Sequence, residues 1–143
     1  MDSTRPLTPA TRPSPAASDI DFVLLDIGGV LADVDQRLSE ERWAALGGAP
    51  ERFDAAFYAS GAKPRGDLGT LDVEGMRAAV SSPALELTRA DLLDVWGAMV
   101  SWRPWVPGFL GRLRRPYGVL STIDPVHAEV LGLLPGAAPI LYS

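Results

Sequence analysis

The pattern of apolar positions predicts a first strand at residues 21–26, with the sequence Asp-Phe-Val-Leu-Leu-Asp. Its apolar run does not alternate with polar residues, and it is followed by the glycine pair Gly28 and Gly29. Continuous hydrophobicity over the length of a strand is typical of a strand buried on both faces, as in parallel sheets. Two further strands of this kind are predicted at residues 117–121 and 139–142.

Between the first and second strands the apolar positions take up helical spacing. One helix is expected to end at Gly47, and a second to begin near Pro50, which suits a first helical turn. A glycine-rich break over residues 61–69 separates them from a third helix, which Asp72 is expected to cap. These residues predict a helical insertion between the first two strands.

The best-marked helix begins at Thr88, a favourable N-cap residue, with Asp91 in its first turn. Leu87 and Leu92 occupy the positions of a hydrophobic staple. The two prolines in residues 102–107 then predict an extended connection.

Two more helices are predicted in the last third of the chain. The first covers residues 107–115, just before the strand at 117–121. The second starts with Asp124 and Pro125 as N-cap and first residue, and runs to about Leu134. Both flank that strand.

Strands that alternate with helices predict an α/β fold with a parallel sheet of about three strands and right-handed crossovers. We expect a disordered leader at 1–18, an α/β core formed by 19–35 and 101–143, and a helical cap inserted at 36–100. The first strand should then lie at an edge of the sheet.

Composition narrows the classes of function that the chain could have. The chain has 143 residues, a net charge of −5 and no cysteine, which excludes disulfides and thiolate chemistry. The acidic balance argues against nucleic acid as a partner, and no apolar run is long enough to cross a membrane. The leader lacks the apolar core of a secretory signal, so we expect a cytoplasmic protein; its Arg and Ser content leaves a transit peptide as the alternative.

Polar groups stand at the ends of two predicted strands, where ligands of parallel sheets bind. Asp26 ends the first strand and could act as a nucleophile that forms an acyl phosphate. Gly28 and Gly29 would let backbone N–H groups approach phosphate oxygens, and Ser121 would add a hydroxyl donor. The helix that starts at Asp124 points its positive dipole end nearby. These groups predict a phosphoryl-transfer site.

Two motifs resemble those of the haloacid dehalogenase (HAD) superfamily. Its first motif is similar to FVLLDIGGVL, and its second is similar to YGVLSTIDPVHAEVL. The helical cap that follows the first motif is similar to GDLGTLDVEGMRAAV and LTRADLLDVWGAMV. The resemblance extends over residues 20–143 and is greatest to the sugar-phosphate phosphatase-like members.

The resemblance implies a Mg²⁺-dependent phosphatase of small phosphorylated metabolites. Asp26 would be the nucleophile and a Mg²⁺ ligand, and the carbonyl of Gly28 would be a second ligand. Ser121, Thr122 and the backbone at Gly28 and Gly29 would hold the transferring phosphoryl group. Dehalogenase chemistry, which uses the same Asp without a metal, ranks lower.

The sequence departs from the family pattern in three ways. Gly28 stands where a second Asp usually acts as general acid and base, and Thr122 stands where Asn is frequent. The lysine of the third motif and the acidic pair of the fourth would both lie beyond Ser143. Lys63 belongs to a Gly-x-Lys-Pro stretch that imitates the third motif but precedes the second, so we interpret it as a decoy. We therefore expect an incomplete core and metal site, and impaired activity of this chain.

Other interpretations stay open. The chain could be a truncated or degenerate HAD-like protein without catalysis that binds phosphate or a partner. A signalling receiver domain fits less well, because its acceptor Asp follows the third strand without a helical insertion. His127, the only histidine, is expected to be structural, and Lys63 and Arg65 to be a solvated pair, with an anionic substrate as the alternative.

Overall fold

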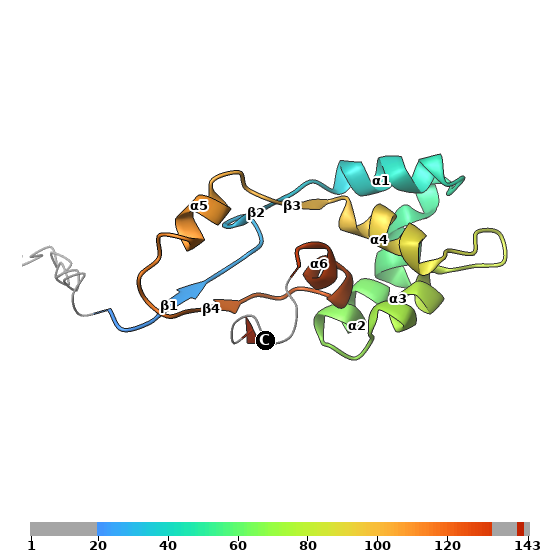
Figure 1. Ribbon diagram of the computed structural model, residues 1–143. Coiled ribbons are helices and arrows are strands. Elements are labelled where there is room, and N and C mark those ends of the chain that lie inside the picture. The colour runs from blue at the N-terminus through green and yellow to red at the C-terminus, as the bar shows by residue number, and fades with distance from the viewer. Residues whose placement is uncertain (1–19, 133–139, 142–143) are drawn as a thin grey trace, which may run out of the picture.

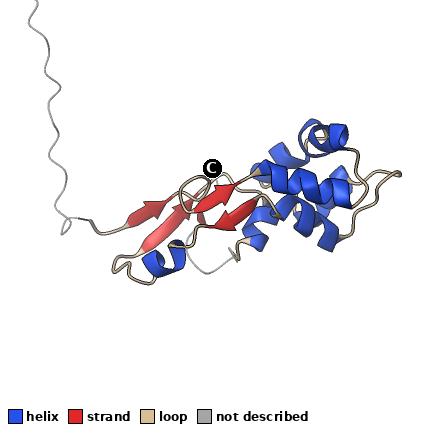
Figure 2. Ribbon diagram, turned by 90° about the horizontal axis from the view of Figure 1, so that it is seen from above, coloured by secondary structure: helices blue, strands red, loops and turns tan. Residues whose placement is uncertain are grey.

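The computed structural model describes residues 20–132 and 140–141 (Figure 1). The predicted leader at 1–18 lies outside the described residues, as do residues 139 and 142 of the strand predicted at 139–142. The strands gather toward one end of the molecule and most helices toward the other (Figure 2).

A three-stranded sheet confirms the predicted α/β fold. Its strands are β1 (Val23–Leu25), β4 (Tyr117–Leu120) and β5 (Ile140–Leu141), in the order β1-β4-β5. Both pairings are parallel, and Val23 lies opposite Tyr117 while Leu25 lies opposite Val119. The three strands therefore end at the same edge of the sheet.

In the described part of the chain, β1 lies at the edge of this sheet, as the sequence predicts. Phe22, just before β1, and Leu24, within it, are about half exposed, at 48% and 49%. The first strand is therefore less buried than its continuous hydrophobicity suggests.

A second, antiparallel pair of strands was not predicted. It consists of β2 (Ala32–Val34) and β3 (Val100–Trp102), with Ala32 opposite Trp102. The extended connection expected at 102–107 is wrong at both ends, because Trp102 is the last residue of β3 and residues 106–107 already belong to the helix Val106–Leu110. Three-residue strands are too short for a periodic signal, and their pairing joins positions far apart in the sequence.

The helical insertion contains more helix than the sequence suggests. Its elements are α1 (Gln36–Ala45), η2 (Pro50–Arg52), η3 (Ala55–Ala59), α2 (Ala62–Asp67), α3 (Val73–Val80) and α4 (Arg89–Gly97). The predicted break at 61–69 is wrong, because α2 occupies most of it. Gly61 enters α2 with a left-handed φ of 80°, and the proline in its first turn is tolerated there.

The helix predicted at Thr88 is confirmed with its cap. Thr88 accepts a hydrogen bond from the Asp91 N–H, and the Asp91 side chain accepts one from the Thr88 N–H in return. Further along α4, Trp96 is fully buried and stacks on Phe57, with ring centroids 4.3 Å apart. The core of the helical insertion forms around this pair.

The two later helices are shorter than predicted. Helix α5 spans Val106–Leu110 instead of 107–115, and Pro116 disfavours helical backbone just before it. Helix α6 spans Pro125–Val130 and ends before Gly132, which has a φ of 71°. Helix α6 packs against α4 of the insertion. Among the described helices, none has both the length and the apolar character needed to cross a membrane.

Candidate functional site

Parallel pairing of β1 and β4 brings the two predicted site segments to one edge of the sheet. Leu25 lies opposite Val119, so Asp26 and Ser121 each follow shortly after the paired residues. Parallel sheets bind ligands at this carboxyl edge.

Asp26 directly follows β1, and its side chain is exposed. One carboxylate oxygen, Oδ1, accepts a hydrogen bond of 2.7 Å from the N–H of Ile27. The carbonyl of Ile27 in turn accepts bonds from the N–H groups of Val30, Leu31 and Ala32, at 2.9 to 3.1 Å. This tight loop holds the carboxylate at the edge of the sheet.

The glycine pair lies in the same loop. Gly29 has a φ of +73°, in the left-handed region that favours glycine, and its N–H donates to the carbonyl of Ala32 at 2.9 Å. A side chain at Gly28 would meet no atom within 4 Å. Open space therefore adjoins the backbone of Gly28, where a ligand could lie.

A cavity of about 200 Å³ lies between this edge and the helical insertion. Gly28, Ser121 and Thr122 line it from the sheet side. Asp26 and Gly29 do not line it but adjoin its lining residues Ile27 and Gly28 in the chain. Gln36, Tyr58 and Lys63 line it from the insertion. The other lining residues are Ile27, Ala32, Val34, Met99, Val100, Ile123, His127 and Leu131.

Lys63 lines this cavity, a position that fits the alternative given for it, contact with an anionic substrate, better than the solvated pair that was expected. It lies on α2, and its Nζ contacts both carboxylate oxygens of Asp67 at 2.5 Å. The Lys63 side chain is 22% exposed and therefore less solvated than expected, whereas Arg65 is exposed as expected. The i,i+4 spacing of Lys63 and Asp67 would have indicated the ion pair if the segment had been interpreted as a helix.

A buried polar cluster joins the helical insertion to α6. Asp124 is fully buried; its Oδ1 accepts bonds from the N–H groups of Val126 and His127, both at 3.0 Å. Its Oδ2 accepts a bond of 2.9 Å from Trp96 Nε1 and lies 3.0 Å from His127 Nδ1. His127 Nε2 lies 3.0 Å from the Trp96 carbonyl oxygen. These contacts give His127 a structural role at the edge of the cavity.

The same cluster sets the charge state of Asp124. Burial raises the pKa of this carboxyl, but the hydrogen bonds and charge of His127, with the bond from Trp96, outweigh that effect. The pKa of Asp124 therefore lies below its usual value of 3.8, and the side chain is ionised at neutral pH.

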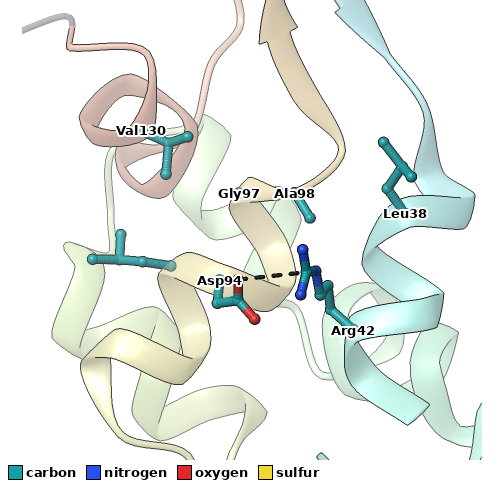
Figure 3. Close-up of a pocket in the computed structure, with 7 residues that line it drawn as sticks. Leu38, Arg42, Asp94, Gly97, Ala98 and Val130 are labelled. Atoms are coloured by element: carbon teal, nitrogen blue, oxygen red, sulfur yellow. Dashed lines mark ion pairs between the residues drawn. The ribbon is translucent and has the colours of Figure 1, made fainter. Parts of the chain in front are cut away.

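A second cavity, of about 290 Å³, opens among α1, α4 and α6 (Figure 3). Arg42 and Asp94 approach each other across it at 4.0 Å, and Leu38, Gly97 and Val130 are also in its lining. It contains none of the residues that the sequence marks as a site. The smaller cavity is therefore the candidate site.

The residues present fit a magnesium ion only in part. Asp26 and the carbonyl of Gly28 are oxygen ligands of the kind that Mg²⁺ prefers. In residues 20–132 and 140–141, however, no group of three or more His, Cys, Asp or Glu side chains could hold a metal. These residues supply two ligand positions, and water and substrate would have to fill the others.

Comparison with known proteins supports the fold. No protein-family model and no curated protein matches the sequence. A HAD family enzyme from Bacteroides thetaiotaomicron, solved with magnesium and inorganic phosphate, is similar in structure, with a TM-score of 0.66 and 18% identity over 77% of this chain. A predicted HAD-like family hydrolase from Porphyromonas gingivalis has a TM-score of 0.66 and 20% identity over 87% of this chain.

The chain spans 57% of the first of these proteins and 66% of the second. At this level of identity the likeness establishes the fold. The described residues thus have the HAD-like α/β fold that the two sequence motifs predict.

Proposed function

We propose that this chain belongs to the HAD superfamily and is a phosphatase-type hydrolase of small phosphorylated metabolites. One observation carries the proposal: β1 and β4 pair in parallel, and Gly28, Ser121 and Thr122 line one cavity beside Asp26. The phosphate and magnesium bound by the Bacteroides protein of the same fold support it.

Asp26 would act as the nucleophile. The Ile27 N–H donates a hydrogen bond to Oδ1 of Asp26. We therefore assign Oδ2 as the oxygen that attacks the phosphorus atom of the ester. A bond from Oδ2 to phosphorus forms, the bond from phosphorus to the ester oxygen breaks, and the alcohol leaves with a proton from water. Water then attacks the aspartyl phosphate, which releases inorganic phosphate and regenerates Asp26.

The loop backbone at Gly28 and Gly29, with Ser121 and Thr122, would hold the phosphoryl oxygens. Magnesium, bound by Asp26 and the Gly28 carbonyl, would supply positive charge to balance the phosphoryl group. Both hydroxyl residues line the cavity, and Ser121 is the more buried of the two, since it is 8% exposed whereas Thr122 is exposed.

We further propose that residues 1–143 alone turn over phosphate esters slowly. Gly28 offers no acid for the leaving group, and the only lysine, Lys63, is paired with Asp67. Phosphate monoester hydrolysis requires on the order of 20 kcal/mol of barrier lowering, and catalytic groups that act as a unit are strongly non-additive. A phosphate-binding protein without catalysis is the second candidate, and the cavity with few metal ligands favours it.

The test combines turnover with binding. The purified chain is assayed with p-nitrophenyl phosphate and sugar phosphates in Mg²⁺, and inorganic phosphate is titrated while amide NMR shifts are followed. We expect shifts at Gly28, Ser121 and Thr122 with little turnover. Asp26→Asn should remove any turnover, whereas Asp21→Asn, the same change before β1, should not.

Each outcome separates the candidates. Mg²⁺-dependent turnover that only Asp26→Asn removes would support the hydrolase and contradict the slow turnover. Phosphate binding without turnover would favour the non-catalytic protein. The absence of both turnover and phosphate-induced shifts at these residues would overturn both candidate functions.

A further inference from the structure

The wall of the cavity opposite the proposed phosphate site is polar. Gln36 from α1, Tyr58 from η3 and Lys63 from α2 line it, each from a different helical element. In a phosphate ester bound at Gly28 and Ser121, the leaving group would face this wall. A volume of about 200 Å³ suits a small leaving group, since sites for drug-sized ligands start at about 300 Å³.

The polar groups of this wall are already paired with acids or with each other. Lys63 Nζ contacts both oxygens of Asp67 at 2.5 Å. Gln36 Nε2 donates to Glu40 Oε1 at 2.8 Å, and Gln36 Oε1 accepts from the Tyr58 hydroxyl at 3.1 Å. The positive charge of Lys63 is therefore compensated before any ligand binds.

Several acidic side chains act on Tyr58 at this wall. Burial, and then the charges of Asp54, Asp124, Asp67 and Glu40, raise the pKa of Tyr58. Of these acids, Asp67 is paired with Lys63, and Asp124 Oδ2 lies 3.0 Å from His127 Nδ1. Asp54 and Glu40 add negative charge, so a second anionic group placed here would be repelled.

We propose that this wall selects phosphate esters whose leaving group carries hydroxyls and no negative charge, and that Asp67 enforces the selection by compensating Lys63. Asp67 is a positioning residue, because it does not line the cavity and acts through the lysine that does. This inference rests on the phosphate site proposed above.

Two ligands of matched shape test it. Glycerol 3-phosphate and 3-phosphoglycerate differ only in whether one end is an alcohol or a carboxylate. Isothermal titration calorimetry at pH 7 should show the first binding to the native chain about tenfold more tightly, the effect of one charge a few ångströms from another near a surface.

Removing the charge of Asp67 should change this preference. In Asp67→Asn, Lys63 becomes available, so 3-phosphoglycerate should bind about tenfold more tightly while glycerol 3-phosphate changes less than about twofold. Lys63→Gln, which leaves Asp67 unbalanced, should weaken 3-phosphoglycerate further. The matched control Asp94→Asn removes an acid at the other cavity and should leave the ratio unchanged.

The results distinguish failure of this charge selection from failure of the proposed phosphate site on which it rests. If inorganic phosphate binds but the two ligands bind equally, or if Asp67→Asn leaves their ratio unchanged, the charge selection is wrong and the phosphate site stands. If neither ligand nor inorganic phosphate binds, the proposed phosphate site fails and the selection with it. A circular dichroism melt of each variant identifies loss of folding. If Asp67→Asn does not fold, the binding of the two ligands to Lys63→Gln decides whether the charge selection holds.

Discussion

The indole N–H of Trp96 donates a hydrogen bond of 2.9 Å to Oδ2 of Asp124. Trp96 belongs to α4 of the helical insertion, and Asp124 caps α6 just after the segment that carries Ser121 and Thr122. The bond therefore fixes the insertion to the side of the cavity that belongs to the sheet. Because both groups are buried and one is a carboxylate, the bond is of the strong, charge-assisted kind.

Trp96→Phe should destabilise the protein by about 2 kcal/mol, the usual worth of a buried hydrogen bond to a charged group. A phenyl ring can still stack on Phe57, but the N–H is lost, and the void left by the smaller ring adds to the destabilisation. Urea unfolding at pH 7 measures the change. Trp105→Phe is the matched control, because Trp105 is half exposed; a similar loss in both variants would contradict the prediction.

Asp124 should make stability depend on acid pH. Its pKa in the folded chain lies below 3.8, so its contribution is present above that pH and is lost as pH falls through the lower, folded value. Asp124→Asn should be less stable at pH 5, and the gap to the native chain should shrink as the pH falls below 3.8. Urea unfolding over this range measures the gap, and a constant gap would contradict the lowered pKa.

The two glycines of the loop after β1 should differ in their tolerance of alanine. Gly29→Ala should cost about 1 kcal/mol of stability, because the φ of +73° is strained for a side chain. Gly28→Ala should cost less than about 0.5 kcal/mol, since its added Cβ meets nothing within 4 Å. Thermal unfolding compares them.

The Gly28 variant also separates an effect on phosphate binding from an effect on stability. Gly28 lines the cavity, so Gly28→Ala should weaken the binding of inorganic phosphate even though it leaves stability unchanged. Calorimetric titration measures this affinity. Unchanged phosphate affinity in Gly28→Ala would contradict the placement of phosphate beside this loop.

Gly97 should be required for the close packing of α4 against α6. A Cβ there would lie 2.5 Å from Cγ2 of Val130, so Gly97→Ala should cost about 1–3 kcal/mol through overpacking (Figure 3). Val130→Ala should recover at least about 1 kcal/mol of this loss in the double variant. Gly108→Ala in α5, where a Cβ meets nothing, is the control. Additive effects of the Gly97 and Val130 changes would contradict this account.

The sequence by itself determined the parallel α/β fold and the segments that form the sheet edge. The strands predicted at 21–26 and 117–121 are marked by continuous apolar runs, although the first is less buried than its run suggests. Caps such as Thr88 and Asp124 depend on neighbours two or three positions away. The same local patterns identified Asp26, Gly28 and Ser121 as polar or glycine residues at the ends of predicted strands. Where the determining contacts are local or periodic, the pattern along the chain is sufficient.

Only the tertiary structure decided the far wall of the cavity. Glycine and proline suggested a break where α2 forms, because local propensity does not include the packing of Gly66 against Met76 and Asp124. Lys63 reaches the cavity through that helix, and the pairing of β2 with β3 and of Trp96 with Asp124 joins positions far apart in the sequence. Such contacts depend on how whole helices and strands pack, and no periodic pattern in the sequence indicates them.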